Sequence, residues 1–188
     1  CMNSVKEYFE NEIRLFSQIP FAQVDLVIAQ LERARVEGRR IFLFGNGGSA
    51  ATASHFACDL GKGTIKPNRP RFKVIALGDA LPTLTAYAND FGYDNVFAEP
   101  LITLAERGDI AIAFSGSGNS PNVVRAVQAA EKHGLVTIAF TGFDGGKIQD
   151  RVELNVHVPA NSFPLVEDAH MAMTHAICEM LKLEHSPH

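Results

Sequence analysis

Two groups of residues in this sequence have types and spacings that could carry out chemistry. The first is a pair of loops rich in glycine and small polar residues, Gly45–Ala50 and Ser115–Pro121, each of which follows a short apolar run. The second is a set of ionisable side chains, which comprises His55, Asp59, Glu167 and His175. The loops suit the binding of an anion, and the ionisable set suits proton transfer or the binding of a metal.

The loop Ser115–Pro121 predicts an anion site at the start of a helix. Pro121 suits the first helical position, where its missing N–H is harmless, and Ser120 suits the N-cap. Glycines let the backbone approach a ligand, hydroxyls donate hydrogen bonds, and the helix dipole favours negative charge. For one such loop, a flexible turn in which Ser120 merely caps the helix is an even alternative. Two such loops favour a phosphate site.

Motif spacing argues against NAD and excludes a triphosphate P-loop. Gly45-x-Gly47-x-x-Ala50 imitates a dinucleotide fingerprint, which needs an acidic residue about 20 positions later. The segment Gly63–Pro67 contains no acid, and Asp79 is too distant. A triphosphate loop is excluded as well, because no Gly-Lys-Ser/Thr occurs.

Helical spacing predicts that the ionisable side chains face one cleft. His55 and Asp59 are four residues apart and share a helix face. Glu167 and His175 are eight apart, which is about 80° around a helix, whereas His170 lies on the far side of Glu167 from His175. Such groups can transfer protons, bind a divalent metal, or do both. Each alone is more often structural, so the interpretation depends on all four converging.

Composition limits the class of protein. The chain has 188 residues, 46% of them hydrophobic, and a formal net charge of −4, which is a poor match to nucleic acid. The longest apolar runs are far shorter than the roughly 20 residues of a membrane span, so a soluble, cytoplasmic protein is expected. Three widely spaced cysteines provide no disulfide framework, and Cys1, which precedes Met2, takes no part in the functional argument.

The apolar pattern predicts a doubly wound α/β fold, with two amphipathic helices between Val5 and Arg35 that break at Pro20. Unbroken apolar runs are typical of strands that are covered on both faces, as in a parallel sheet. The expected strands are Ile41–Phe44, Val74–Leu77, Ile110–Phe114, Val136–Phe140 and Leu154–Val158. The expected helices of the body are Ala50–Leu60, Leu81–Ala88, Val96–Ala105, Asn122–Lys132 and Leu165–Leu183. A single domain over residues 1–188 is expected, with helices in 1–38 for oligomer packing and a ligand-binding body in 39–188.

Taken together, these motifs resemble the sugar-isomerase (SIS) domain and, within it, the phosphoheptose isomerases. The resemblance is carried by the two loops, His55-Phe56-Ala57, Ala88–Gly92, Thr141–Gly146 and Glu167-x-x-His170-x4-His175. It covers essentially the whole chain. It implies a flavodoxin-like five-stranded parallel sheet with an N-terminal helical hairpin, and a homotetramer whose sites lie between subunits.

The resemblance also implies an activity, which is the conversion of sedoheptulose 7-phosphate to D-glycero-D-manno-heptose 7-phosphate through an enediolate. Asp59 would be the general base and His175 the general acid. The resemblance also implies one Zn²⁺ per site, held by His55, Asp59, Glu167 and His175. Phosphate would be bound by Ser49, Ser115, Ser117 and Ser120, and sugar hydroxyls by Asn46 and Asp90, with Gly47, Gly116 and Glu167 also in the substrate site. The product would supply a surface polysaccharide such as lipopolysaccharide.

Three positions depart from the family pattern. Asp59 stands where a glutamate is usual, Leu165-Val166-Glu167 replaces Arg-x-Gln, and Gly61-Lys62-Gly63 lacks an arginine. Such changes would alter substrate choice or abolish activity. A second hypothesis is therefore a non-catalytic SIS protein that binds a sugar phosphate or associates with a replication initiator.

Overall fold

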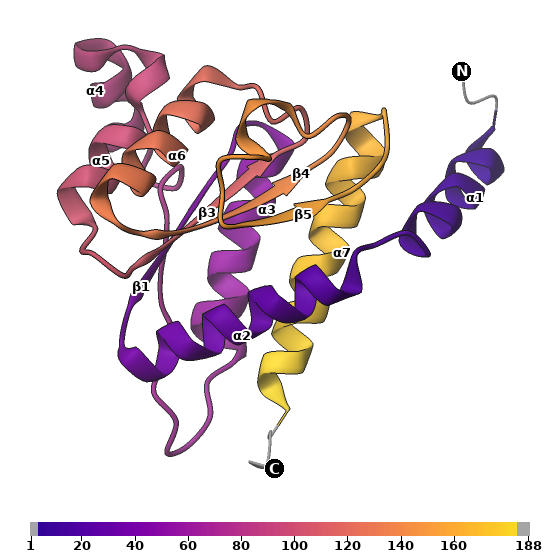
Figure 1. The fold of residues 1–188 in the computed structure, drawn as a ribbon, viewed down its shortest axis with the longest axis horizontal. Helices are drawn as coiled ribbons and strands as arrows, with labels where there is room; N and C mark the ends of the chain where they lie inside the picture. The colour runs from indigo at the N-terminus through magenta and orange to yellow at the C-terminus, as the bar shows by residue number, and fades with distance from the viewer. Residues whose placement is uncertain (1–3, 184–188) are drawn as a thin grey trace.

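The computed structural model describes residues 4–183 and contains a five-stranded parallel sheet with helices on both faces (Figure 1). The sheet order is β2-β1-β3-β4-β5, which is the flavodoxin-like order. The strands are β1 (Arg40–Phe44), β2 (Lys73–Ala76), β3 (Ile110–Ser115), β4 (Val136–Thr141) and β5 (Leu154–His157). The predicted doubly wound fold is therefore confirmed, and each strand lies within one or two residues of its predicted bounds.

Seven α-helices and three shorter helical turns connect and cover these strands within the described residues. The α-helices are α1 (Val5–Phe16), α2 (Phe21–Glu37), α3 (Gly48–Cys58), α4 (Leu81–Phe91), α5 (Ala98–Leu104), α6 (Pro121–His133) and α7 (Phe163–Lys182). The turns are a π-helix, η1 (Asp59–Gly63), and two 3₁₀ turns, η2 (Tyr93–Asn95) and η3 (Gly146–Ile148).

The unbroken apolar runs serve two separate cores, because successive side chains of a strand point to opposite faces of the sheet. In β1, Ile41 and Leu43 pack into a core with α2, α3 and α7. Phe42 and Phe44 pack into a second core with α5 and α6. The helices α3 and α7, which carry the ionisable groups, therefore pack against the same face of the sheet.

The strands β1 and β3 are neighbours in the sheet, but the helices that follow them, α3 and α6, cover opposite faces. The hydrogen-bonded neighbours of β1 are β2 on one side and β3 on the other. The loops that follow β1 and β3 consequently diverge at their carboxyl ends, and this is where open α/β sheets form their ligand crevice. Both glycine-rich loops lie at this position.

The two N-terminal helices break at Pro20, as predicted. The Ser4 hydroxyl accepts a hydrogen bond from the Glu7 N–H and caps α1. In Figure 1, α1 extends outward from the body, next to the amino end of α7. The Tyr8 hydroxyl donates a hydrogen bond to Asp168 of α7 and ties the two helices together. Among residues 4–183, no helix is long and apolar enough to cross a membrane.

The helix after the first loop differs from its predicted bounds. A helix was predicted over Ala50–Leu60. In the structure α3 begins at Gly48 and ends at Cys58, and the π-helical turn η1 follows it from Asp59. Single π-helical turns are rare and frequently occur at functional sites. Asp59, the predicted base, is the first residue of this turn.

Candidate active site

The two glycine-rich loops enclose a cavity of about 140 Å³. Ser49 lies in the first turn of α3 and Ser120 at the N-cap of α6, so two helix N-termini meet there. The other lining residues are Asn46, Phe114, Ser115, Gly116, Ser117, Phe163 and Glu167. The cavity is much smaller than a drug-sized pocket, and its helix N-termini and hydroxyls suit an anion such as a phosphate group.

The serine hydroxyls of this cavity keep their donor hydrogens available. Ser115 Oγ accepts a hydrogen bond from the Gly118 N–H, and Ser117 Oγ accepts one from the Asn119 N–H. A hydroxyl that accepts still has its own O–H to donate. Ser120 occupies the predicted N-cap position, but its side chain makes no capping hydrogen bond. This observation favours the ligand-binding interpretation of the loop over simple capping.

Backbone packing explains why glycine is required in the second loop. Gly118 has a φ of +63°, and a Cβ there would collide with the carbonyl oxygen of Gly145. The loop Gly142–Gly146 therefore lies directly against the loop Ser115–Pro121 and supports its shape.

Glu167 brings a carboxylate to the cavity from α7. Its oxygens lie so close to Gly48 that a Cβ at that position would collide with them. Gly48 is the first residue of α3, where the helix dipole favours negative charge. Glu167 therefore approaches the same helix end that the predicted phosphate would use.

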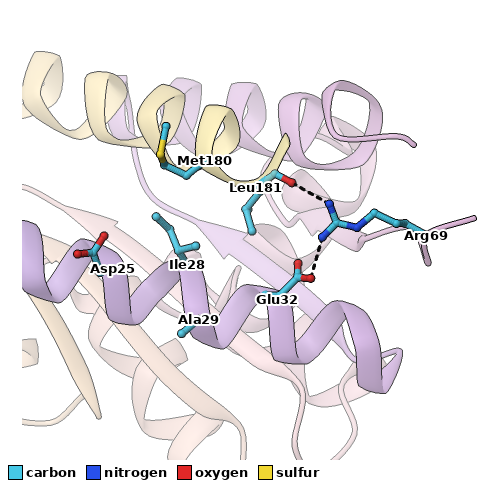
Figure 2. A pocket seen from close by; sticks show the side chains of 7 residues that line it. All are labelled: Asp25, Ile28, Ala29, Glu32, Arg69, Met180 and Leu181. Atoms are coloured by element: carbon cyan, nitrogen blue, oxygen red, sulfur yellow. Dashed lines mark hydrogen bonds and ion pairs between the residues drawn. The ribbon is translucent and has the colours of Figure 1, made fainter. Parts of the chain in front are cut away.

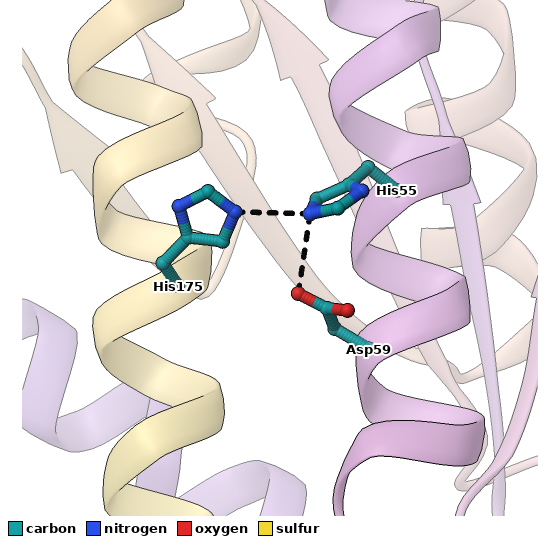
Figure 3. Close-up of side chains that lie close together, drawn as sticks. All are labelled: His55, Asp59 and His175. Carbon is teal, nitrogen blue, oxygen red and sulfur yellow. Dashed lines mark hydrogen bonds and ion pairs between the residues drawn. The ribbon is translucent and has the colours of Figure 1, made fainter.

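Three of the four predicted ionisable side chains converge between α3 and α7. Figure 3 shows His175 reaching from α7 towards His55 and Asp59. His55 Nε2 lies 2.9 Å from His175 Nε2 and 3.2 Å from Asp59 Oδ2. One ligand atom from each residue lies within 4.8 Å of the other two. All three side chains are at least partly exposed and so accessible to a small molecule.

Glu167 is outside this three-residue group and lines the serine cavity instead. Helical rise accounts for the separation, since eight residues span about 12 Å along an α-helix. The predicted angle keeps Glu167 and His175 on one side of α7, but it does not bring them to the same height. Ser49 and His55, six residues apart on α3, are separated by about 9 Å in the same way.

The remaining predicted residues lie around these two centres. Gly47 is the N-cap of α3 with a φ of +55°. Asp90 lies on the exposed α4, away from the serine cavity, where it lines a different cavity with Tyr87. His170 is 1% exposed, and its Nε2 lies 3.2 Å from the Thr141 carbonyl oxygen. Burial beside Phe114 and Phe140 lowers the pKa of His170 to about 4, so it is a neutral core residue at pH 7.

Two residues that contact the site were not predicted. Asn122 and Tyr93 both hydrogen-bond to Asn46, one from the first turn of α6 and one from η2. Nothing in their local sequence indicates this role, because the contacts join segments 76 and 47 residues apart.

A larger cavity of about 380 Å³ lies between α2 and the carboxyl end of α7 (Figure 2). At one end of it, Arg69 donates hydrogen bonds to Glu32 (2.8 Å) and to the Leu181 carbonyl (3.4 Å). The rest of its lining is largely apolar apart from Asp25, and Arg69 and Glu32 are paired with each other. Convergent polar groups of the kind that catalysis uses lie instead at the serine cavity and at the group of His55, Asp59 and His175.

Comparisons with known proteins agree with the fold. The family model described as "SIS domain" matches residues 7–142. A phosphoheptose isomerase of Thermodesulfovibrio yellowstonii is 36% identical over 183 residues, which cover 96% of this chain and 90% of that protein. A phosphoheptose isomerase of Aliarcobacter butzleri is 44% identical, with 78% of this chain and 77% of that protein covered.

Solved structures show the same likeness. Phosphoheptose isomerase GmhA from Neisseria gonorrhoeae superposes with a TM-score of 0.87 at 31% identity, covering 94% of this chain and 96% of that one. A phosphoheptose isomerase from Francisella tularensis gives 0.88 at 26% identity, with 95% and 96% covered. The fold and site thus define an SIS-domain protein. More narrowly, the chain belongs to the phosphoheptose isomerase family.

Proposed function

We propose that this protein interconverts sedoheptulose 7-phosphate and D-glycero-D-manno-heptose 7-phosphate. The observation that carries the proposal is the convergence of His55, Asp59 and His175 next to a cavity built from two helix N-termini. Family membership supplies the reaction class, and the site contains the groups that this reaction needs.

The isomerisation moves one proton between neighbouring carbons. Asp59 removes a proton from C1 of the ketose while His175 donates a proton to the C2 carbonyl oxygen, which produces an enediol through an enediolate-like transition state. The O1 hydroxyl then loses its proton to His175, and Asp59 returns its proton to C2, which produces the aldose. His55 Nε2 lies within hydrogen-bond reach of His175 Nε2 and of Asp59 Oδ2, and it can orient either of them, because one ring nitrogen makes one such hydrogen bond at a time.

Phosphate binding positions the reacting carbons. We assign the 7-phosphate to the cavity formed by Ser49, Ser115, Ser117 and Ser120, whose hydroxyls and helix N-termini face it. In an extended sugar phosphate, C1 and C2 are far from this group, which matches the spacing of about 9 Å along α3 between Ser49 and His55. Binding energy from a distant phosphate can thus orient the carbons for proton transfer. Asn46 and Glu167 are available for the sugar oxygens between the two centres, and we assign Asp90 the same role across a subunit boundary.

The His55 group fits a divalent metal, and we propose one Zn²⁺ per site. Two imidazoles and a carboxylate are the ligand set of many catalytic zinc sites, which leave a further position open. Ligands at about 2.1 Å from a tetrahedral ion are about 3.4 Å apart. Two of the three pairs here lie at 2.9 and 3.2 Å, and all three ligand atoms lie within 4.8 Å of one another. A bound metal would stabilise negative charge on the substrate oxygens. Because Asp59 faces His55 through Oδ2, its other oxygen remains available for the proton. His175 faces His55 through Nε2, so with a metal on that nitrogen the proton that His175 transfers would be held by Nδ1.

We further propose a cytoplasmic homotetramer whose sites are completed by neighbouring subunits. Val5, Phe9 and Ile13 form a stripe along the outer face of α1 and are 76%, 56% and 71% exposed. Apolar residues at this spacing normally pack against another surface. Residues 1–38 would then serve assembly, and residues 39–188 would hold the sugar phosphate for a polysaccharide pathway.

The test is turnover of sedoheptulose 7-phosphate followed by NMR, with the zinc content of the purified protein measured in parallel. We expect His175→Ala to lower kcat/KM by about 100-fold or more while the fold is retained, because a general acid contributes roughly that factor. It should also lose most of its zinc. His133→Ala, at the exposed end of α6, is the matched control and should leave both values unchanged. Undiminished turnover in His175→Ala would remove His175 from the mechanism, and no turnover in the unmodified protein with or without zinc would favour a sugar-phosphate-binding protein.

A further inference from the structure

A pair of side-chain amides, Asn46 and Asn122, lies at the rim of the serine cavity. Asn46 Nδ2 donates a hydrogen bond to Asn122 Oδ1, and Asn122 Nδ2 donates one to Asn46 Oδ1, both at 2.9 Å. The Tyr93 hydroxyl donates a third hydrogen bond to Asn46 Oδ1, also at 2.9 Å. Asn122 is 2% exposed, whereas Asn46 lines the cavity. The pair therefore joins the α6 helix start to a residue that faces the ligand.

A backbone group sets the orientation of both amides. The Val123 N–H lies in the first turn of α6, has no partner within the helix, and donates to Asn122 Oδ1 at 3.0 Å. Because a backbone N–H can only donate, the oxygen of Asn122 must be on that side. With Asn122 Oδ1 fixed in this way, it accepts from Asn46 Nδ2 as well, and Asn122 Nδ2 donates to the Asn46 oxygen. The orientation of Asn46 follows from the start of α6.

Most of the hydrogen-bonding capacity of the Asn46 side chain is already used. An amide oxygen accepts two hydrogen bonds, and both are taken here by Asn122 and Tyr93. The amide nitrogen has two N–H groups, and one is used by Asn122 within the described residues. Asn46 can therefore offer the cavity one donor and no acceptor.

We propose that Asn122 and Tyr93 are positioning residues that hold Asn46 as a pure hydrogen-bond donor towards an acceptor oxygen of the sugar phosphate. The inference rests on the proposed substrate class, but not on turnover. Neither residue touches the reacting atoms, so both act through Asn46. An unrestrained amide would present either face, and part of the population would direct its oxygen at the substrate oxygen.

A double-mutant cycle tests this proposal by calorimetric binding of sedoheptulose 7-phosphate. We expect Asn122→Ala to raise the Kd about tenfold and Tyr93→Phe about threefold. These factors correspond to the loss of neutral hydrogen bonds that hold Asn46 in place. In an Asn46→Ala background, each should change the Kd by less than about twofold, because nothing remains to be positioned. A separate contribution of Asn122 would appear as the same fold-change in both backgrounds, and that result would overturn the proposal.

Kinetics and controls separate positioning from simple stability. KM should rise while kcat stays within about twofold, because the donor holds an oxygen in both the ground and transition states. Gln128→Ala removes an amide farther along α6 and should change neither value. Tyr93 is 56% exposed, so Tyr93→Phe keeps the fold even if Asn122→Ala does not.

Inorganic phosphate is a second probe that distinguishes failure of this inference from failure of the proposed function. If the protein binds phosphate but not the heptose phosphate, the proposed substrate is wrong, and the same cycle is evaluated with phosphate. If neither probe binds, both proposals are overturned. If both bind and the cycle is additive, only the positioning role is lost.

Discussion

Asp59 is the residue at which this chain departs most directly from the expected catalytic pattern. Aspartate is one methylene shorter than the usual glutamate, yet its Oδ2 lies 3.2 Å from His55 Nε2. The π-helical turn begins at this residue and changes the backbone path there. We interpret the shorter side chain and the local backbone as a matched pair that still delivers the carboxylate to the histidines.

Asp59→Glu tests that interpretation. The longer side chain should displace the carboxylate by about 1 Å, and kcat/KM for the heptose phosphate should fall about 10- to 100-fold. Steady-state kinetics measures the change, and Asp150→Glu, at an exposed position after η3, is the control for an added methylene. A gain in activity for Asp59→Glu would show that aspartate is a defect rather than a matched feature.

At the scale of elements, α7 combines a buried histidine with the active-site residues. His170 packs against Phe114 and Phe140, and burial lowers its pKa to about 4, against an ordinary value near 6.5. The hydrogen bond with the Thr141 carbonyl works against this shift, and nearby His157 adds to it. Its Nδ1 is buried without a hydrogen-bond partner among the described residues, so the neutral ring is the form that the core accepts.

Folding stability should therefore depend on pH between about 4 and 6.5. In this window the unfolded chain binds a proton at His170 that the folded chain does not, so the free energy of unfolding falls as the pH falls. The loss from this residue should approach about 3 kcal/mol at pH 4. Urea unfolding at several pH values measures it. His170→Gln should remove most of the slope and His133→Gln should not, whereas an unchanged slope in His170→Gln would assign the dependence to other groups.

At the scale of the whole molecule, α1 presents an apolar stripe to solvent. The helix is attached to α7 by the hydrogen bond from Tyr8 to Asp168, and burial raises the pKa of the Tyr8 hydroxyl well above its usual range. This anchoring leaves Val5, Phe9 and Ile13 facing outward. A fixed helix with an exposed apolar face is suited to packing against another copy of the chain.

The change Phe9→Glu should convert the proposed tetramer to smaller species. A charge in an apolar interface is costly unless it is paired, so the assembly should weaken even though the subunit fold is intact. Sedimentation velocity over a range of concentrations measures the mass. Glu10→Gln, on the neighbouring position, is the control. A monomeric unmodified protein would contradict both the tetramer and the completion of the site by neighbouring subunits.

Sequence alone determined the elements and the identity of the chemical groups. Strand runs such as Ile110–Phe114 are continuous and apolar because both faces of a parallel sheet are buried, and the pairing of His55 with Asp59 follows from helical spacing. The resemblance of the loop and histidine motifs to SIS domains added the strand order, which local patterns do not encode.

Only the tertiary structure decided which groups actually meet. Periodicity specifies the angle of a side chain around its helix, but not its height along the axis. It therefore grouped Glu167 with His175, whereas Glu167 lines the serine cavity, where the resemblance had also placed it in the substrate site. The amide pair of Asn46 and Asn122 joins loops 76 residues apart and has no local signature. Contacts between distant segments arise from packing of the whole chain, and this is why the positioning residues were found only in the folded molecule.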